Sequence, residues 1–164
     1  MLIALQTDSN NNPNNNYLYD RDQYLWRLEA IAHLQARDFQ NLDVEHLLEE
    51  IEILAGRDRA EVESRLGVLL AHLLKRIYVN NTYDHRGWEI TIREQRRQLR
   101  ITLQQSPSLR KYFEQVFDRA WQDALMEVRE DYPNYQLPDT WQFNHEIDQL
   151  LTDKFWTSSA DERS

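Results

Sequence analysis

Apolar residues recur at intervals of three and four along most of the chain, and this spacing predicts helices rather than strands. A first helix is expected from about Asp20 to Ala36, and a second from about Asp43 to Ile77, with Asp43 as its N-cap. The apolar face of the first helix consists of Tyr24, Leu28, Ile31 and Leu34. Gly56 is the weakest point of the second helix, and we expect a kink or a short break there.

Two further helices are expected over residues 88–104 and 106–131, and a short last helix from Asn144. Ser106 before Pro107 favours a helix start, because serine is a good N-cap and proline is tolerated at the first helical position. The apolar stripe of the third helix contains Trp88, Ile92, Leu99 and Leu103. The stripe of the fourth contains Leu109, Phe113, Val116, Phe117, Ala120, Ala124 and Val128. Short connections between long helices predict an all-α fold, an up-down four-helix bundle.

The ends of the chain differ from this helical region. Residues 7–16 include six asparagines, a composition that buries too little apolar surface to order itself. We therefore predict a flexible, disordered arm over 1–16, a single helical domain over 17–156 and a disordered tail over 157–164. The last part of that domain is an extension rich in aromatic residues: Tyr132, Tyr135, Trp141, Phe143, Phe155 and Trp156. It is interpreted as a strap over one end or side of the bundle, or alternatively as a docking surface for a partner.

Several stretches of the sequence resemble a known family. They are "EEIE" and "HLLK" in the second helix, "IREQRR" in the third and "SPSL" before the fourth, in that order. Together they resemble the domain of unknown function 29 family, which is frequent in cyanobacteria, over residues 18–156. The resemblance implies an all-helical fold and brings no catalytic or binding residues. One local departure is Arg76 after Lys75, where family members often have tryptophan.

Composition excludes several functional classes. The chain of 164 residues contains no cysteine, which removes disulfides, thiolate chemistry and cysteine-type zinc sites. Its net charge of −9 should repel nucleic acid and anionic membranes. No apolar run approaches about 18 residues, and the N-terminal residues lack a basic segment, so neither a membrane span nor a signal peptide is expected. We therefore expect a cytoplasmic protein that does not bind membranes.

Charge is unevenly distributed along the chain. Residues 43–63 hold eight carboxylates against two arginines, a net charge of −6. Residues 75–111 hold nine basic residues against three acidic ones, a net charge of +6. An antiparallel bundle could pair the two segments, so that ion pairs fix the register of the helices. The alternative is a nucleic-acid surface with stacking aromatic residues, which would use Arg93, Arg96, Arg97, Arg100, Trp88, Tyr78 and Tyr83.

Candidate chemistry is sparse. His46-x-x-Glu49 is the reverse of the usual order for a metal site in a bundle, and it occurs only once. His72 lies among leucines and is the best candidate for acid–base chemistry, with Glu50 or Glu94 as its expected partner. The candidate polar cluster contains nine residues: Glu49, Glu50, Glu52, His72, Lys75, Trp88, Arg93, Arg96 and Arg97.

These features favour a small interaction or regulatory protein without catalytic activity or cofactor. Its expected partner is another protein or a second copy, and nucleic acid is not expected. The alternative is a metal-dependent hydrolase or nucleic-acid-acting enzyme that uses the Glu/His cluster beside the arginines of the third helix.

Overall fold

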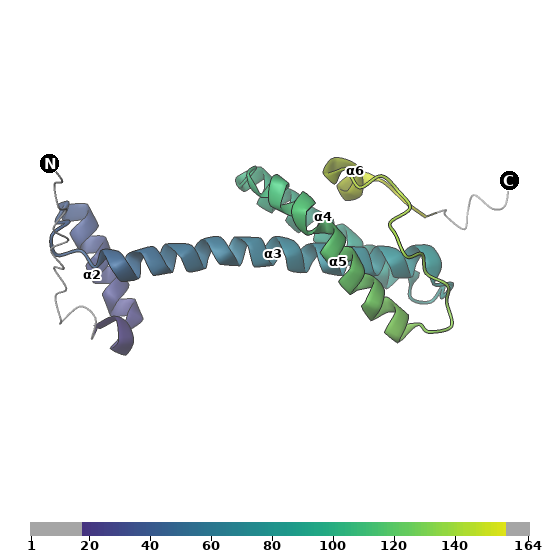
Figure 1. Cartoon of the computed structure of the whole chain (residues 1–164), viewed down its shortest axis with the longest axis horizontal. Coiled ribbons are helices and arrows are strands. Elements are labelled where there is room, and N and C mark those ends of the chain that lie inside the picture. The colour runs from purple at the N-terminus through teal and green to yellow at the C-terminus, as the bar shows by residue number, and fades with distance from the viewer. Residues whose placement is uncertain (1–17, 157–164) are drawn as a thin grey trace, which may run out of the picture. The chain divides into compact units, whose positions relative to one another are not determined.

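The computed structural model describes residues 18–156, and every regular element in that range is a helix (Figure 1). The helices are α2 (Gln23–Ala36), α3 (Val44–Tyr78), α4 (His85–Gln105), α5 (Leu109–Asp131) and α6 (Ile147–Thr152), and residues 18–21 are also helical. The all-α prediction is confirmed. The predicted arm and tail lie outside the described residues, and the prediction of a single domain stays a prediction. The chain divides into two compact units, Met1–Gly56 and Arg57–Ser164, which are described in turn.

In the first unit, side chains and backbone define where α2 begins and ends. Asp22 is the N-cap residue, and its carboxylate accepts a hydrogen bond of 2.9 Å from the Leu25 N–H. At the other end Arg37 has a left-handed backbone with φ 55°, and its N–H donates to the Leu34 carbonyl. A left-handed residue of this kind is a common helix stop, because its N–H satisfies a carbonyl of the last turn.

The small core of the first unit forms around one tryptophan. Trp26 is 2% exposed, and its indole Nε1 donates to the Asp43 carboxylate at 3.0 Å. Asp43 also accepts from the His46 backbone N–H, which confirms it as the N-cap of α3, and its carboxylate lies 2.7 Å from the His46 ring. Burial would raise the pKa of Asp43, but the hydrogen bonds from His46 and Trp26 outweigh it and lower the pKa. Tyr19 stacks on His46 at 4.1 Å and meets the edge of Trp26.

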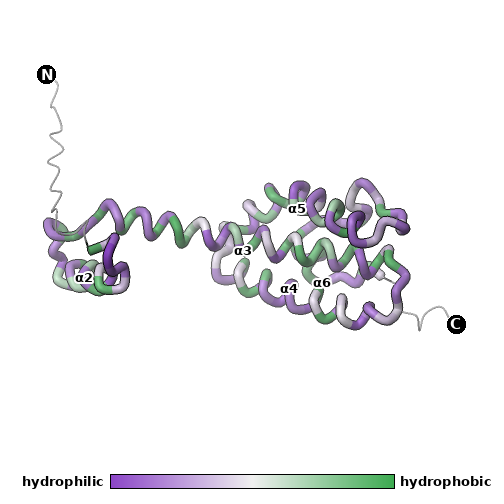
Figure 2. Tube along the Cα trace, turned by 90° about the horizontal axis from the view of Figure 1, so that it is seen from below, coloured by the Kyte–Doolittle hydropathy of each residue, from purple (hydrophilic) through white to green (hydrophobic). Residues whose placement is uncertain are grey.

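The apolar face predicted for the first helix is not buried. Among residues 18–56 the buried side chains are Trp26 and Ala30, and Trp26 lies on the opposite side of α2 from Tyr24, Leu28 and Ile31. The exposed apolar residues of α2 are Tyr24, Leu25, Leu28, Ile31 and Leu34. Those of the first turns of α3 are Val44, Leu48, Ile51, Ile53 and Leu54. Both helices of this unit therefore carry recurring apolar residues that no other part of the unit buries (Figure 2).

Helix α3 includes Gly56, the last residue of the first unit, without interruption. The predicted break there is wrong. Glycine lowers helix propensity by only about 1 kcal/mol, and no proline removes a hydrogen bond from the ladder.

The second unit is a bundle of four helices: the part of α3 after Gly56, α4, α5 and α6. Arg65 of α3 reaches Gln95, whereas Arg76, further along α3, reaches the earlier residue Glu89, so α4 runs antiparallel to α3. Glu63 of α3 pairs with Arg119 of α5, and Lys75, further along α3, lies near Asp131, further along α5. Helix α5 therefore runs parallel to α3. The predicted up-down order is therefore present in α3, α4 and α5. The fourth member is the short α6, because α2 belongs to the first unit.

The core of this bundle follows the predicted stripes. Its fully buried large side chains include Leu66, Leu69, Leu73, Ile92, Leu99, Phe113, Leu125 and Leu150. Two boundaries differ from the prediction. α4 begins at His85 rather than Trp88, and Ser106 is the C-cap of α4 while α5 begins at Leu109. Pro107 lies in the turn between them, where the Leu109 N–H donates to the Ser106 carbonyl.

Residues 132–156, which we call the C-terminal strap, return along the second unit and include α6. Tyr132, Trp141, Phe155 and Trp156 pack against the core, which confirms the strap interpretation. Trp121 of α5 donates its indole N–H to the Asp139 carbonyl at 3.1 Å, and α6 contacts both α4 and α5. The strap is thus part of the structure of this unit.

Candidate functional site

A cavity of about 440 Å³ lies between α4 and the end of the strap, and we call it the α4–strap pocket. Residues three, four and seven apart share one face of a helix, so α4 presents several long side chains to this cavity. The lining residues that matter here are Arg93, Arg96 and Arg100 of α4, and Leu151, Lys154 and Trp156 of the strap.

Arg96 is the buried cationic residue of the pocket lining, with 8% of its surface exposed. Its Nη2 donates to the Asp153 carbonyl at 2.6 Å, and its guanidinium lies 5.8 Å from the centre of the Phe155 ring. Its Nε, which is also buried, has no hydrogen-bond partner among residues 18–156. Burial, and then the nearby charge of Arg100, lower the pKa of Arg96 to about 10, against an opposing effect of Asp153. Arg96 therefore stays charged at neutral pH.

Trp156, at the end of the strap, also lines the pocket. The Arg76 guanidinium lies 5.2 Å from the centre of its ring, a cation–π distance. Its indole Nε1 is buried, and the described chain offers it no acceptor. Arg100 donates to the Leu151 carbonyl at 2.9 Å and so holds the strap at the rim. Two buried donors of lining residues are therefore left without an acceptor among the described residues.

The other predicted residues of α3 and α4 in this unit have structural partners. Lys75 lies 3.6 Å from Glu127 of α5, and Trp88 is buried in contact with the ring of Tyr132. Arg97 pairs with Glu94 of its own helix. Hydrogen bonds from Arg97 and Gln98 lower the pKa of Glu94 to about 2.

His72 bonds to the backbone of its own helix. Its Nδ1 lies 2.9 Å from the Val68 carbonyl, so this nitrogen carries the proton, since a carbonyl only accepts. The predicted partners Glu50 and Glu94 are wrong. Burial lowers the pKa of His72, and the charge of Lys75 lowers it further, so the imidazole is neutral at pH 7.

The three glutamates of the predicted cluster belong to the first unit. Glu49 and Glu52 are exposed, and Glu50 accepts hydrogen bonds from Arg27 and Tyr19. Six of the nine predicted residues belong to the second unit, so the prediction of one common cluster stays a prediction. Within residues 18–156, no three His, Asp or Glu side chains are placed to hold a metal ion.

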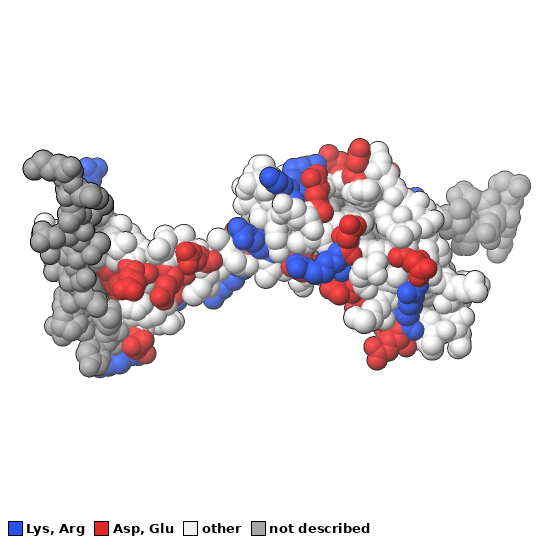
Figure 3. All heavy atoms as spheres, viewed as in Figure 1, with Lys and Arg blue, Asp and Glu red and all other residues white. Residues whose placement is uncertain are grey.

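We had predicted that the arginines and lysines of residues 75–111 pair with the acidic segment 43–63. Those whose partners the structure shows pair with other residues instead. Besides Lys75, Arg97 and the arginines of the pocket, Arg76 pairs with Glu89 and Arg110 with Asp148. Figure 3 shows basic and acidic residues interleaved on the visible face of the second unit, unlike the continuous basic stripe of a nucleic-acid surface.

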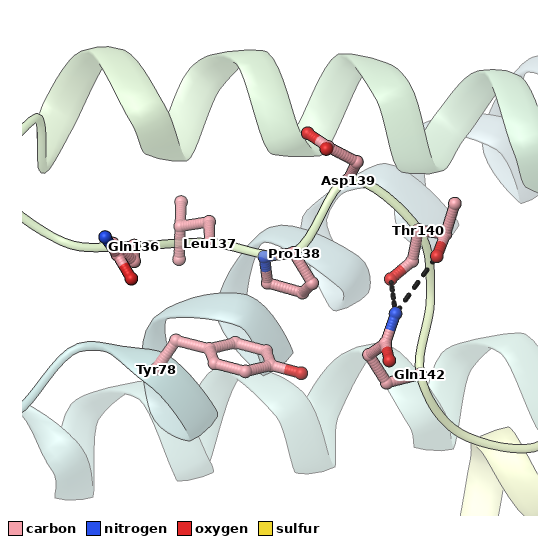
Figure 4. Close-up of a pocket in the computed structure, with 7 residues that line it drawn as sticks. All are labelled: Tyr78, Gln136, Leu137, Pro138, Asp139, Thr140 and Gln142. Carbon is pink, nitrogen blue, oxygen red and sulfur yellow. Dashed lines mark hydrogen bonds between the residues drawn. The ribbon is translucent and has the colours of Figure 1, made fainter.

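A second cavity, of about 590 Å³, lies between Tyr78 and residues 136–142 (Figure 4). Its polar groups are largely satisfied by each other, because Gln142 donates to the Thr140 carbonyl and hydroxyl. Asp139 points away toward α5, where it pairs with Arg129. Burial raises the pKa of Tyr78, so its hydroxyl stays neutral. This cavity offers less chemistry than the α4–strap pocket.

The fold and the pocket define an all-helical protein in which α4 and the C-terminal strap line an open cationic cavity. The chain belongs to the family described as the domain of unknown function DUF29, whose model matches residues 18–156. No curated protein and no solved structure matches it. No helix in the described part of the chain is both long and apolar enough to cross a membrane.

Sequence reasoning placed Arg93 and Arg96 in the candidate cluster and Arg100 in the alternative nucleic-acid surface, but it did not select Lys154. It interpreted Trp156 as part of the strap or, alternatively, of a docking surface. These residues meet across 57 positions of the chain, as the bond from Arg96 to Asp153 shows. No local spacing signals that contact. The density of aromatic residues after α5 was the available indication.

Proposed function

We propose that this protein is a small interaction protein that acts by binding, and that its partner docks on the first unit. The observation that supports this is the set of exposed apolar side chains on two helices of that unit. Leu28 is 45% exposed and Ile51 is 54% exposed, in stripes where each helix repeats apolar residues every three or four positions. Exposed apolar stripes on a helical unit are typical of surfaces that a partner covers.

Charge indicates which partner fits. Residues 18–56 carry nine carboxylates and three arginines, a net charge of −6. Figure 3 shows acidic side chains gathered along this part of the chain. A second copy would bring the same charge to the interface, and like charges in apposition oppose binding. An amphipathic helix with basic flanks would cover the apolar stripes and neutralise the carboxylates, and this is the partner we propose.

Site-specific photocrosslinking tests this proposal. A benzophenone amino acid would replace Leu28 or Ile51 in the full chain, expressed in its own cells, and the cross-linked peptide would be identified by mass spectrometry. We expect both positions to link to one basic, amphipathic helical segment of another protein.

Met126 provides the matched control, because it is 67% exposed on α5 of the second unit and should not link to that segment. Cross-links from Leu28 to a second copy would replace the proposed partner with a homodimer. Equal capture of the same protein by Met126 would refute the docking surface.

A further inference from the structure

We propose that the α4–strap pocket binds a small organic anion, with an oxyanion head group against Arg96 and Trp156 and an apolar body in the rest of the cavity. This inference is independent of the partner proposed for the first unit. It rests on a cationic lining together with two buried donors of lining residues, the Nε of Arg96 and the Nε1 of Trp156, that have no acceptor among the described residues. Buried donors without partners are rare in folded proteins, because each costs about 1–3 kcal/mol, and more for a charged group.

A purely structural role explains only part of the pocket. Nη2 of Arg96 and Nη1 of Arg100 donate to strap carbonyls, and those bonds fix the strap to α4. They do not account for the two unsatisfied donors. Nor do they explain why Arg93 and Lys154 line the same cavity.

The electrostatics of the cavity favour an anion. Arg93, Arg96, Arg100 and Lys154 contribute four positive charges in a protein whose net charge is −9. The acidic residue of the lining, Glu89, is already engaged by Arg76 at 2.6 Å. A carboxylate or phosphate oxygen would therefore gain charge-assisted hydrogen bonds from this lining.

Size and lining indicate that the ligand is larger than an inorganic ion. A volume of about 440 Å³ is within the range of cavities that hold small organic molecules. Ile92, Leu151 and the Trp156 ring supply apolar walls. The pocket therefore fits an aromatic or branched aliphatic body that carries one carboxylate or one phosphate monoester.

The test compares phenylacetate, phenyl phosphate and neutral 2-phenylethanol, each titrated into the full chain and followed by NMR. We expect at least one anion to cause saturable shifts of the Trp156 indole N–H signal. Its dissociation constant should lie below about 10 mM, the range of a fragment of this size. The two anions distinguish a carboxylate site from a phosphate site. Equal binding of the alcohol, or no saturable shift with either anion, would overturn the proposal.

Variants test the donors directly, with dissociation constants taken from α4 amide shifts. Trp156→Phe keeps an aromatic ring and removes the indole N–H, so anion binding should weaken about tenfold while the chain stays folded. Arg93→Gln should weaken it several-fold. Arg86→Gln is the matched control, an exposed arginine of α4 outside the pocket lining. An equal loss in Arg86→Gln and Arg93→Gln would show a general charge effect and contradict a built site.

Discussion

Truncation of Leu150 to alanine is expected to destabilise the second unit by about 2–5 kcal/mol and to release the strap from α4. Leu150 is fully buried at the centre of α6, the only helix of the strap among the described residues. Removing its methyl groups leaves a cavity and loses the apolar burial that holds six residues of helix in place. Such a short helix has little stability of its own, so it depends on this packing.

Urea denaturation of the full chain measures the loss, and hydrogen exchange of amides 146–156 locates it. Asp148→Ala is the control, because that neighbour is exposed and its pair with Arg110 is worth at most about 1 kcal/mol. If Leu150→Ala left exchange in the strap as slow as Asp148→Ala does, the strap would not be held by its apolar contacts.

Replacement of Trp26 by alanine is expected to unfold α2 locally. A buried tryptophan contributes about 3–5 kcal/mol, and Trp26 is the principal core residue of the first unit. The variant also leaves Asp43 without its indole donor. Amides of residues 23–36 should then exchange about 100-fold faster or more, while amides of α5 keep their protection.

Tyr24→Ala is the matched control on the same helix, because Tyr24 is exposed and its loss should change stability by less than about 0.5 kcal/mol. Trp26→Phe should fall between the two, since it keeps most of the ring and loses the hydrogen bond. Equal exchange in Trp26→Ala and Tyr24→Ala would show that α2 does not depend on this core.

The helices of the second unit were the most predictable part of the chain. The stripe of α4 at Trp88, Ile92, Leu99 and Leu103 is buried as its spacing predicts. The stripe of α5 is buried in the same way, except for the half-buried Leu109. Periodicity succeeds here because each helix has one apolar face and a neighbour that covers it. The start of α4 was missed by three residues, because His85, Arg86 and Gly87 resemble a turn in composition.

Periodicity could not show what covers a face. The α2 stripe has the same spacing as the stripes of the bundle, yet Leu28 and Ile31 are exposed and Trp26 is buried on the other side. The net charges of two segments likewise could not show which residues pair with each other. Arg97 finds Glu94 three residues away on its own helix, a local pairing that a balance of +6 against −6 does not reveal.

Calorimetry with a synthetic peptide of the cross-linked segment tests whether the exposed apolar stripes of the first unit bind a basic amphipathic helix. The affinity of the full chain for this peptide would be measured with wild type, Leu28→Gln/Ile51→Gln and Met126→Gln. We expect the double variant to bind at least tenfold more weakly, because it removes central apolar contacts, and Met126→Gln to bind like wild type. Wild-type affinity in the double variant, with its fold intact, would contradict the proposal.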